Sequence, residues 1–501
     1  MENRSAGILL PISSLPSDYG IGCFSKSAYE FVDWLKEAGQ TYWQILPLGP
    51  TSYGDSPYQS FSTFAGNPYF IDLDTLVEEG VLDKKDCEKV NWGKKPDDVD
   101  YEKIYKGRYP LLRKAYENSD ISKNPDYQKF VAENSWWLSD YALFMAVKDR
   151  FGGVEWTKWA EDIRLRWNNA MDYYREDLYF DIEFQQYMQF KFYEQWMKLK
   201  SYANSKGIQI IGDIPIYVAM DSADAWAHPE LFQLDEENVP LAVAGCPPDG
   251  FSATGQLWGN PLYRWDYHRD TGYQWWISRM RYCFRLYDVV RIDHFRGFDE
   301  YFAIPYGDTD ATGGHWEKGP GIDLFRRIEQ VLGWKQVIAE DLGYMTDSVR
   351  HLVYESGFPG MKVLEFAFDA RDSGCASDYL PHNYPENCVA YTGTHDNETI
   401  VGWWKSITEE ERKLARDYLC DHATPEEELY QCFISLIMRS AARVCVIPMQ
   451  DYMGLDNRFR MNKPSTVGTN WKWRIKKRDL TKKLQKEIYD VTLRYGRKNW
   501  D

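Results

Sequence analysis

The chain has 501 residues, 44% of them hydrophobic, which is enough to bury the core of one barrel with large insertions or of two or three ordinary domains. Its net charge of −17 argues against nucleic acid and anionic membrane surfaces as partners, because both attract basic faces. A neutral ligand is more compatible with this charge.

The cysteines and the N-terminus indicate where the protein works. The nine cysteines are scattered and include no CxxC pair, which is typical of reduced, buried thiols and predicts neither a zinc site nor a disulfide framework. The N-terminal residues MENRSAGILLPISS contain a short apolar run and no A-x-A-like cleavage site. We therefore expect a cytoplasmic protein with no nucleic acid or membrane partner.

Apolar, β-branched runs recur along the chain, each bounded by Gly, Pro or acidic residues, with helix-period segments between them. The pattern predicts eight strands, near 7–14, 42–48, 208–216, 289–293, 336–340, 361–368, 388–393 and 443–449. Eight strands that alternate with helices predict an α/β fold of the (β/α)8 TIM-barrel type. A helix near the C-terminal end is predicted to start with Thr424 as its cap and Pro425 in its first turn.

Two long excursions interrupt this pattern. The stretch between the second and third strands is far longer than a simple βα connection and is rich in helical periodicity, so 75–205 is predicted to be an inserted helical subdomain. Residues 219–273, after the third strand, include the Gly- and Pro-rich segment AGCPPDGFSATGQLWGNPLY and are predicted to be inserted loops that wall the site. The remainder of 1–501 is predicted to be one catalytic barrel with no C-terminal β-sandwich domain.

Three carboxylates stand at the ends of apolar, strand-like runs: Asp293, Glu340 and Asp396. Moving an unpaired carboxylate out of water is costly, so three such endings suggest that the strands deliver acids to one shared rim. Two carboxylates on facing strands are what glycosidic bond chemistry needs, since one attacks and the other gives and takes a proton. The many aromatic residues suit stacking on sugar rings, although core filling explains most of them.

The neighbours of the three acids suggest separate roles. Arg291 and Asp293 are two residues apart on one strand face, so the cation is expected to lower the pKa of Asp293 and keep it ionised as a nucleophile. Glu340 follows an apolar run, where desolvation raises a carboxyl pKa and suits a general acid/base. His395 and Asp396 are placed to bind sugar hydroxyls.

Each of these clusters alone is more often structural: an ion pair, a helix cap or a solvated turn. Four of them in one chain, counting Asp213 in GDIPIYV, favour a site. A metal site is a less favoured alternative, because the chain has only 8 His and no HExxH or EF-hand pattern. No nucleotide-binding P-loop pattern is present either.

The motifs VVRIDHFRG, VIAEDLG, GTHDNET and IIGDIPIYVAMDSADAW resemble the conserved regions of the 4-α-glucanotransferases. This family, also called amylomaltases or disproportionating enzymes, is glycoside hydrolase family 77 of the α-amylase clan. The resemblance extends over nearly the whole chain through GILLPISSLPSDYGIG, GQLWGNPLY, KGPGIDLF and PMQDYMGLDNRFRMNKP. It implies transfer of α-1,4-glucan segments between maltooligosaccharides or starch-type glucans, with cyclisation of amylose as a further outcome, and no cofactor or metal.

Carried over by position, the resemblance makes Asp293 the nucleophile that forms a covalent β-glucosyl-enzyme, Glu340 the acid/base and Asp396 the acid that binds donor hydroxyls. It also implies a set of substrate-binding residues, with Trp258 on the acceptor side: Tyr58, Asp213, Trp258, Arg291, His395, Asp369, Asn462 and Pro464.

Three departures from related patterns are informative. The α-amylases proper carry Asn-His shortly after the acid that corresponds to Asp213, whereas this chain continues Ile-Pro-Ile-Tyr-Val, which favours the glucanotransferase branch. Gly250 stands where family members usually have an aromatic residue after PPD, so an aromatic platform over the acceptor sites is expected to be missing. Ser465 replaces the glycine of the usual P-G-T.

The main alternative function is an α-1,4-glucan hydrolase of the same clan, because the covalent intermediate can meet either water or a sugar hydroxyl. A non-catalytic glucan-binding protein on a barrel scaffold is a third reading, which the presence of Asp293, Glu340 and Asp396 disfavours.

Overall fold

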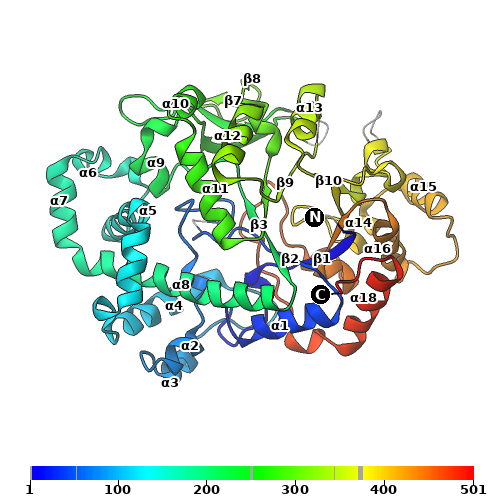
Figure 1. Cartoon of the computed structure of the whole chain (residues 1–501), viewed down its shortest axis with the longest axis horizontal. Helices are drawn as coiled ribbons and strands as arrows, with labels where there is room; N and C mark the ends of the chain where they lie inside the picture. The colour runs from blue at the N-terminus through cyan, green and yellow to red at the C-terminus, as the bar shows by residue number, and fades with distance from the viewer. Residues whose placement is uncertain (1–2, 52–53, 249–251, 344, 371–375, 501) are drawn as a thin grey trace.

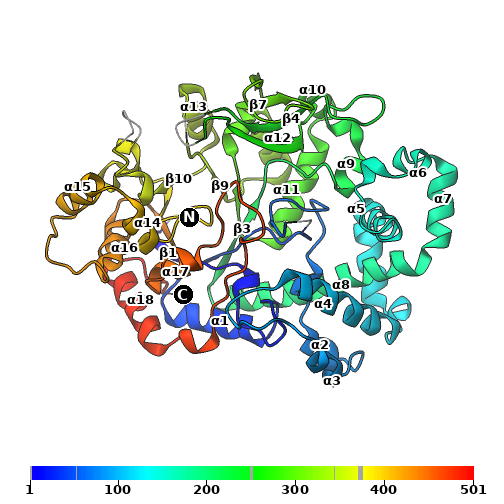
Figure 2. The ribbon, with the colours of Figure 1, turned by 180° about the vertical axis from the view of Figure 1, so that it is seen from behind.

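The computed structural model describes residues 3–51, 54–248, 252–343, 345–370 and 376–500. Eight parallel strands close into a barrel in the order β1–β12–β11–β10–β9–β6–β3–β2, with helices around it (Figure 1 and Figure 2). The (β/α)8 barrel is therefore confirmed. The barrel strands are β1 Ser5–Leu9, β2 Tyr42–Gln44, β3 Gln209–Ile214, β6 Val289–Ile292, β9 Val337–Ala339, β10 Gly360–Val363, β11 Cys388–Tyr391 and β12 Val444–Pro448.

The strands are buried on both faces, which explains why they appear in the sequence as continuous apolar runs. One set of side chains fills the barrel interior, among them Leu9, Ile211, Val289, Val389 and Val446. The alternate residues, such as Ile8 and Ile210, belong to the larger core beneath the helices. The strands are shorter than the apolar runs, because several runs continue into buried loops at the strand ends.

The outer layer contains α1 Lys26–Glu37, α11 Gln274–Leu286, α12 Ile322–Leu332, α13 Asp347–Ser356, α16 Leu429–Arg439 and α18 Lys482–Arg494. In the described part of the segment after β10, 3-10 turns such as Leu364–Phe366 take the place of an α-helix. The predicted helix start at Thr424 is wrong, because α16 begins at Leu429. Thr424 instead donates its hydroxyl to Asp421 at 2.6 Å, a local hydrogen bond that closes a turn.

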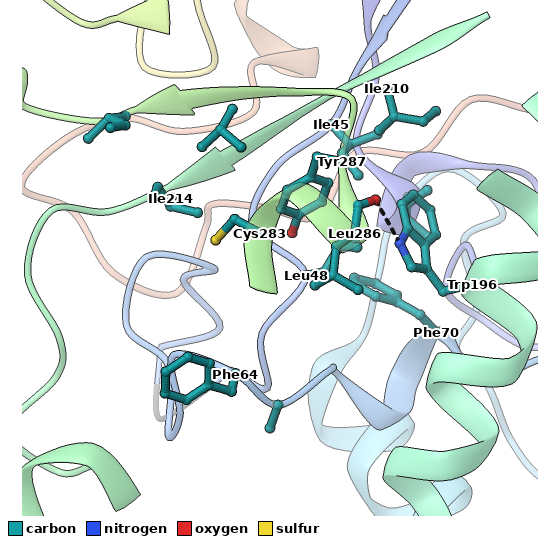
Figure 3. Packing of buried hydrophobic residues seen from close by; sticks show 14 of the residues in the cluster. Ile45, Leu48, Phe64, Phe70, Trp196, Ile210, Ile214, Cys283, Leu286 and Tyr287 are labelled. Atoms are coloured by element: carbon teal, nitrogen blue, oxygen red, sulfur yellow. Dashed lines mark hydrogen bonds between the residues drawn. The ribbon is translucent and has the colours of Figure 1, made fainter. Parts of the chain in front are cut away.

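Seven helices lie between β2 and β3: α2 Leu73–Glu78, α3 Lys84–Lys89, α4 Tyr101–Glu117, α5 Pro125–Arg150, α6 Glu161–Arg164, α7 Asn168–Asp177 and α8 Tyr179–Ser205. The two longest, α5 and α8, pack against each other, and α8 then runs back to the barrel (Figure 1). Figure 3 shows how α8 is anchored there: the indole of Trp196 donates to the Leu286 carbonyl at 3.1 Å within an apolar cluster that includes Phe70 and Tyr287.

A second, antiparallel sheet was missed by the sequence analysis. Its strands, in the order β5–β4–β7–β8, are β4 Ala242–Cys246, β5 Gln256–Pro261, β7 Glu300–Pro305 and β8 His315–Lys318. The 219–273 segment therefore contains a hairpin, together with the short helices α9 Ala223–Ala227 and α10 Trp265–Asp270. Gly245 lets the strands approach, since a Cβ there would lie 2.2 Å from the Gln256 carbonyl oxygen.

Three helices flank the last two barrel strands: α14 Ile400–Ser406, α15 Glu409–Leu419 and α17 Met449–Tyr452. Five of the described cysteines are buried free thiols, namely Cys23, Cys87, Cys283, Cys388 and Cys445, whereas Cys375 and Gly250 lie outside the described residues. No helix within the described ranges is long and apolar enough to cross a membrane.

Candidate active site

Asp293 and Glu340 leave neighbouring strands at the same level of the barrel. Strands β6 and β9 pair in parallel with Ile292 opposite Ala339, so each acid is the next residue on its strand. Two further hydrogen bonds continue the pairing past the strand ends: Glu340 N–H to Ile292 O at 3.1 Å, and Phe295 N–H to Glu340 O at 3.0 Å. The structure thus brings the two acids together on one rim.

Arg291 links two carboxylates beneath this rim. It donates from Nη1 to both oxygens of Asp213 at 2.7 Å, and its Nη2 lies 3.1 Å from Oδ1 of Asp293. The side chains of Arg291 and Asp213 are only 3% and 0% exposed, whereas that of Asp293 remains 28% exposed. The buried pair is therefore fixed, and Asp293 is left facing solvent.

The two rim acids occupy different electrostatic environments. Burial raises the pKa of Asp293 to about 6, although Arg291 acts in the opposite direction. The expected lowering by Arg291 is present, but it does not outweigh burial, so the expectation of a net lowered pKa is wrong. Burial and the nearby Asp293 raise the pKa of Glu340 to about 7, as the apolar strand predicts.

Asp396 lies in the loop that follows β11 and is held ionised. Its Oδ1 accepts a hydrogen bond from Asn462 Nδ2 at 2.6 Å, and its Oδ2 lies 3.3 Å from Nε2 of His395. Although burial opposes the effect, His395 and Asn462 together lower the pKa of Asp396 well below its usual value. The side chain is still 46% exposed, so its second face is open to a ligand.

Tyr58 joins the two sides of the rim. Its hydroxyl donates to Asp213 Oδ2 at 2.8 Å and lies 3.3 Å from Nδ1 of His395. The two rings also stack, with centroids 4.9 Å apart and an interplanar angle of 17°. A continuous chain of contacts thus runs from Asp396 through His395, Tyr58, Asp213 and Arg291 to Asp293.

The remaining predicted residues differ in how they contact the residues of this site. Trp258 on β5 packs edge-on against His294, with ring centroids 4.9 Å apart, which places it beside the Asp293–Glu340 pair. Asn462 contacts Asp396 directly. Pro464 is exposed on the loop that continues from Asn462.

Asp369 lies past β10, within electrostatic range of Glu411 on α15. Its neighbour Ala370 donates its backbone N–H to Glu411 at 3.0 Å. These contacts place Asp369 near α15.

His294 and Arg460 are part of the site and were missed. His294 has a left-handed backbone, φ 53°, which directs its N–H to Glu340 Oε2 at 2.5 Å. Burial lowers the pKa of its ring to about 3, so the ring is neutral. Arg460 donates to the carbonyls of Asp396 and Asn462, each at 2.6 Å. His294 adjoins Asp293 in the sequence, which was an available signal; Arg460 offered none.

Within the described ranges, no group of three or more His, Cys, Asp or Glu side chains is arranged to hold a metal ion. The carboxylates of the rim are instead engaged by Arg291, His395, Asn462 and backbone N–H groups.

The paired acids on the rim of this closed (β/α)8 barrel fit an enzyme that acts on glycosidic bonds. Comparison with known proteins identifies the family. A family model described as 4-alpha-glucanotransferase matches residues 10–481. The 4-alpha-glucanotransferase of Clostridium butyricum is 49% identical over 97% of this chain and 99% of its own length. That of Streptococcus pneumoniae is 48% identical over 100% of this chain and 98% of the relative.

A solved structure of the amylomaltase from Streptococcus agalactiae in complex with acarbose superposes with a TM-score of 0.95. It is 43% identical and covers 99% of this chain and 100% of its own. The chain belongs to the 4-α-glucanotransferase family, glycoside hydrolase family 77, and transfer of glucan segments is favoured over hydrolysis as its activity.

Proposed function

We propose that the chain transfers α-1,4-glucan segments by double displacement at Asp293, with Glu340 as the acid/base. In the first step the Asp293 carboxylate bonds to C1 of the donor sugar while protonated Glu340 gives its proton to the departing glycosidic oxygen. In the second step Glu340 takes the proton of an acceptor 4-hydroxyl as that oxygen bonds to C1 and releases Asp293. The α configuration is retained.

The observation that carries this proposal is the pairing of Asp293 and Glu340 on adjacent strands with different environments. Parallel strands lie about 4.8 Å apart, which suits the ~5–5.5 Å carboxyl separation of retaining enzymes. Arg291 lies against Asp293 and favours its ionised form, whereas Glu340 has the higher pKa, about 7. One acid can therefore attack while the other carries the proton.

Asp396 is proposed to bind hydroxyls of the donor sugar, supported by Tyr58, Asp213, Arg291 and His395 beneath it. Its ionised state and open face support this role. Trp258, Asn462, Pro464 and Asp369 are proposed to contact the bound glucan. The acarbose complex of the Streptococcus agalactiae amylomaltase supports a maltooligosaccharide or α-1,4-glucan as the substrate here.

The same proposal covers the two segments inserted into the barrel. Residues 219–273 would wall the acceptor side through Trp258, and 75–205 would form a helical subdomain beside the barrel. A cytoplasmic location is supported by the free, mostly buried thiols.

Incubation with maltotriose, followed by sizing of the products, tests the reaction. Transfer gives glucose together with oligomers longer than the substrate, whereas hydrolysis gives only shorter sugars. Asp293→Asn is expected to lower turnover by on the order of 10³-fold or more, as for other nucleophile removals. Full activity in this variant would exclude the proposed nucleophile.

Glu340→Gln provides the second arm of the experiment, because protonation of the leaving group is dispensable when that group is fluoride. An α-maltosyl fluoride donor should therefore restore the first step in Glu340→Gln but not in Asp293→Asn. Equal rescue of both variants, or of neither, would contradict the assigned roles.

A further inference from the structure

Residues 392–400 form the loop that carries His395 and Asp396. The loop leaves β11, which lies between β10 and β12 in the barrel. Each of these neighbouring strands is followed by a buried carboxyl group: Glu365 after β10 and Asp451 after β12. The loop is therefore flanked on both sides by an acid that the reaction scheme above does not use.

Asp451 contacts both ends of the loop. Its Oδ2 accepts the hydroxyl of Thr392 at 2.5 Å, and its Oδ1 accepts the backbone N–H of Ile400 at 2.8 Å. Asp451, Thr392 and Ile400 are all completely buried, so water does not compete for these hydrogen bonds. One side chain on α17 thereby spans the start and the end of the loop.

Glu365 contacts the same loop from the other side, where its backbone N–H donates to the Thr392 carbonyl at 3.3 Å. Its Oε1 lies 2.7 Å from the position that a Cβ on Gly393 would occupy, so the carboxyl packs against the Gly393 backbone. That oxygen has no hydrogen-bond partner among the described residues. Burial and the nearby Asp451 raise the pKa of Glu365 well above its usual value.

Hydrogen bonds also hold the parts of the loop that lie between its ends and Asp396. Asn397 Oδ1 accepts two hydrogen bonds from Thr394, one from its N–H and one from its hydroxyl, each at 2.8 Å. Thr399 donates its N–H to Asn457 at 3.2 Å. Because the loop has internal hydrogen bonds, a shift of its ends would move Asp396 rather than be absorbed locally.

We propose that Asp451 is a positioning residue of the transfer reaction, which holds the ends of the 392–400 loop and thereby sets Asp396 against the donor sugar. This inference rests on the proposed role of Asp396. Asp451 does not touch the substrate; it acts through the Thr392 hydroxyl and the Ile400 amide. In this arrangement both groups donate, and each carboxylate oxygen of Asp451 accepts one of the two hydrogen bonds.

Asp451→Asn is the direct test, because an asparagine turns one acceptor into a donor that faces Thr392 or Ile400. It should lower kcat for maltotriose disproportionation by on the order of 10- to 100-fold, with KM changed by less than about threefold. Thr392→Val removes one of the two hydrogen bonds without adding a donor, so it should have a smaller effect in the same direction. Glu365→Gln is the matched control, since it replaces the buried acid on the other side of the loop with an amide of the same shape and keeps the backbone hydrogen bond to Thr392; it should leave kcat within about twofold.

A double-mutant cycle with Asp396→Asn separates positioning from general damage. If Asp451 acts through Asp396, Asp451→Asn should have little further effect in the Asp396→Asn background. Equal losses in both backgrounds, or full activity in both Asp451→Asn and Thr392→Val, would overturn the proposal. Should Asp396→Asn alone retain full activity, the role of Asp396 in the proposed function fails instead, which the cycle reports separately.

Discussion

At the residue scale, the surroundings raise the pKa values of both rim carboxyls, that of Asp293 from 3.8 to about 6 and that of Glu340 from 4.5 to about 7. Both are pushed toward the neutral form by burial, and Arg291 offsets part of that push for Asp293. Because the two acids interact, their protons leave in two steps that belong to the pair. The first loss is expected to centre on Asp293 and the second on Glu340.

The activity of the pair should therefore depend on pH at both ends of a narrow range. With maltotriose, kcat/KM should fall below pH about 6, where Asp293 becomes protonated, and above pH about 7, where Glu340 loses its proton. A rate profile between pH 4 and 9 checks this. With the fluoride donor, Glu340→Gln should lack the alkaline limb of the initial glycosylation step, and a limb that persists there would assign the second ionisation to another group.

The titration of Glu340 should change the stability of the protein with pH in the opposite sense to the titration of a salt-bridged carboxylate. The pKa of Glu340 is raised from 4.5 to about 7, so the folded state holds a proton that the unfolded chain has already lost between these values. Stability contributed by this group is thus lost as pH rises through that window. Glu340→Gln should raise the free energy of unfolding by on the order of 2 kcal/mol at pH 8 and by much less at pH 4. The melting temperatures at the two pH values measure this difference. An equal change at both pH values would contradict the raised pKa.

At the element scale, the loop that bears Pro464 stores backbone strain at a position where the family pattern has glycine. Ser465 has φ 62°, a left-handed conformation that favours glycine. The loop is closed by Asn470, whose Oδ1 accepts the N–H of Lys463 at 3.0 Å and whose Nδ2 donates to Thr466 O at 2.8 Å.

Ser465→Gly should therefore favour the closed loop by about 0.5 kcal/mol, the relief of strain less the entropy that glycine loses. Hydrogen exchange of a peptide spanning 461–471 should slow by roughly twofold. Gly468→Ala provides the mirror-image control, since Gly468 has φ 87° with open space around it, and exchange should then speed up. Identical exchange in all three proteins would show that these backbone angles do not limit loop opening.

The elements differ in how far sequence alone predicts them. All eight barrel strands are predictable, because strands buried on both faces leave continuous apolar runs. The β4–β5 hairpin is not, since its strands contain Gly245 and Gly259 and resemble turns in composition. The start of α16 fails for a related reason: Thr424 and Pro425 fit a helix start, but Asp421 captures the threonine in a turn.

The candidate site divides in the same way. Asp293, Glu340 and Asp396 can be singled out because an acid at the end of an apolar run conflicts with its surroundings. Arg460 leaves no such conflict in the sequence, since an arginine in a polar loop is ordinary; only folding brings it to the Asp396 carbonyl. The net pKa of Asp293 is likewise unpredictable, because it depends on how burial balances against Arg291.

At the scale of the whole molecule, the barrel is closed where the two ends of the chain meet. The side chain of Arg497 is completely buried just after α18. It donates to five backbone carbonyls around β1, β12 and the end of α16, those of Ser5, Met438, Ser440, Ala442 and Arg443, at 2.7–3.2 Å. A single guanidinium thus satisfies carbonyls on both strands of the closing seam.

Arg497→Met should lower the free energy of unfolding by about 3–5 kcal/mol, because it removes five buried hydrogen bonds that a charged guanidinium donates. Urea unfolding followed by tryptophan fluorescence measures this, and kcat of the folded fraction should be unchanged. Arg494→Met, at an exposed position at the end of α18, is the matched control. Its free energy of unfolding should lie within about 0.5 kcal/mol of that of the parent. A loss below about 1 kcal/mol in Arg497→Met would show that the seam does not depend on this side chain.

The seam also imposes an order on biosynthesis. β1 is made first, but its partner β12 begins at Val444 and Arg497 follows almost at the end of the chain. During translation one edge of β1 therefore stays without its partner strand until β12 has been made. Pairings between such distant segments form slowly, and an open edge is a template for association with other chains. The growing chain is thus exposed to aggregation at β1 for as long as the segments between β1 and β12 are being made.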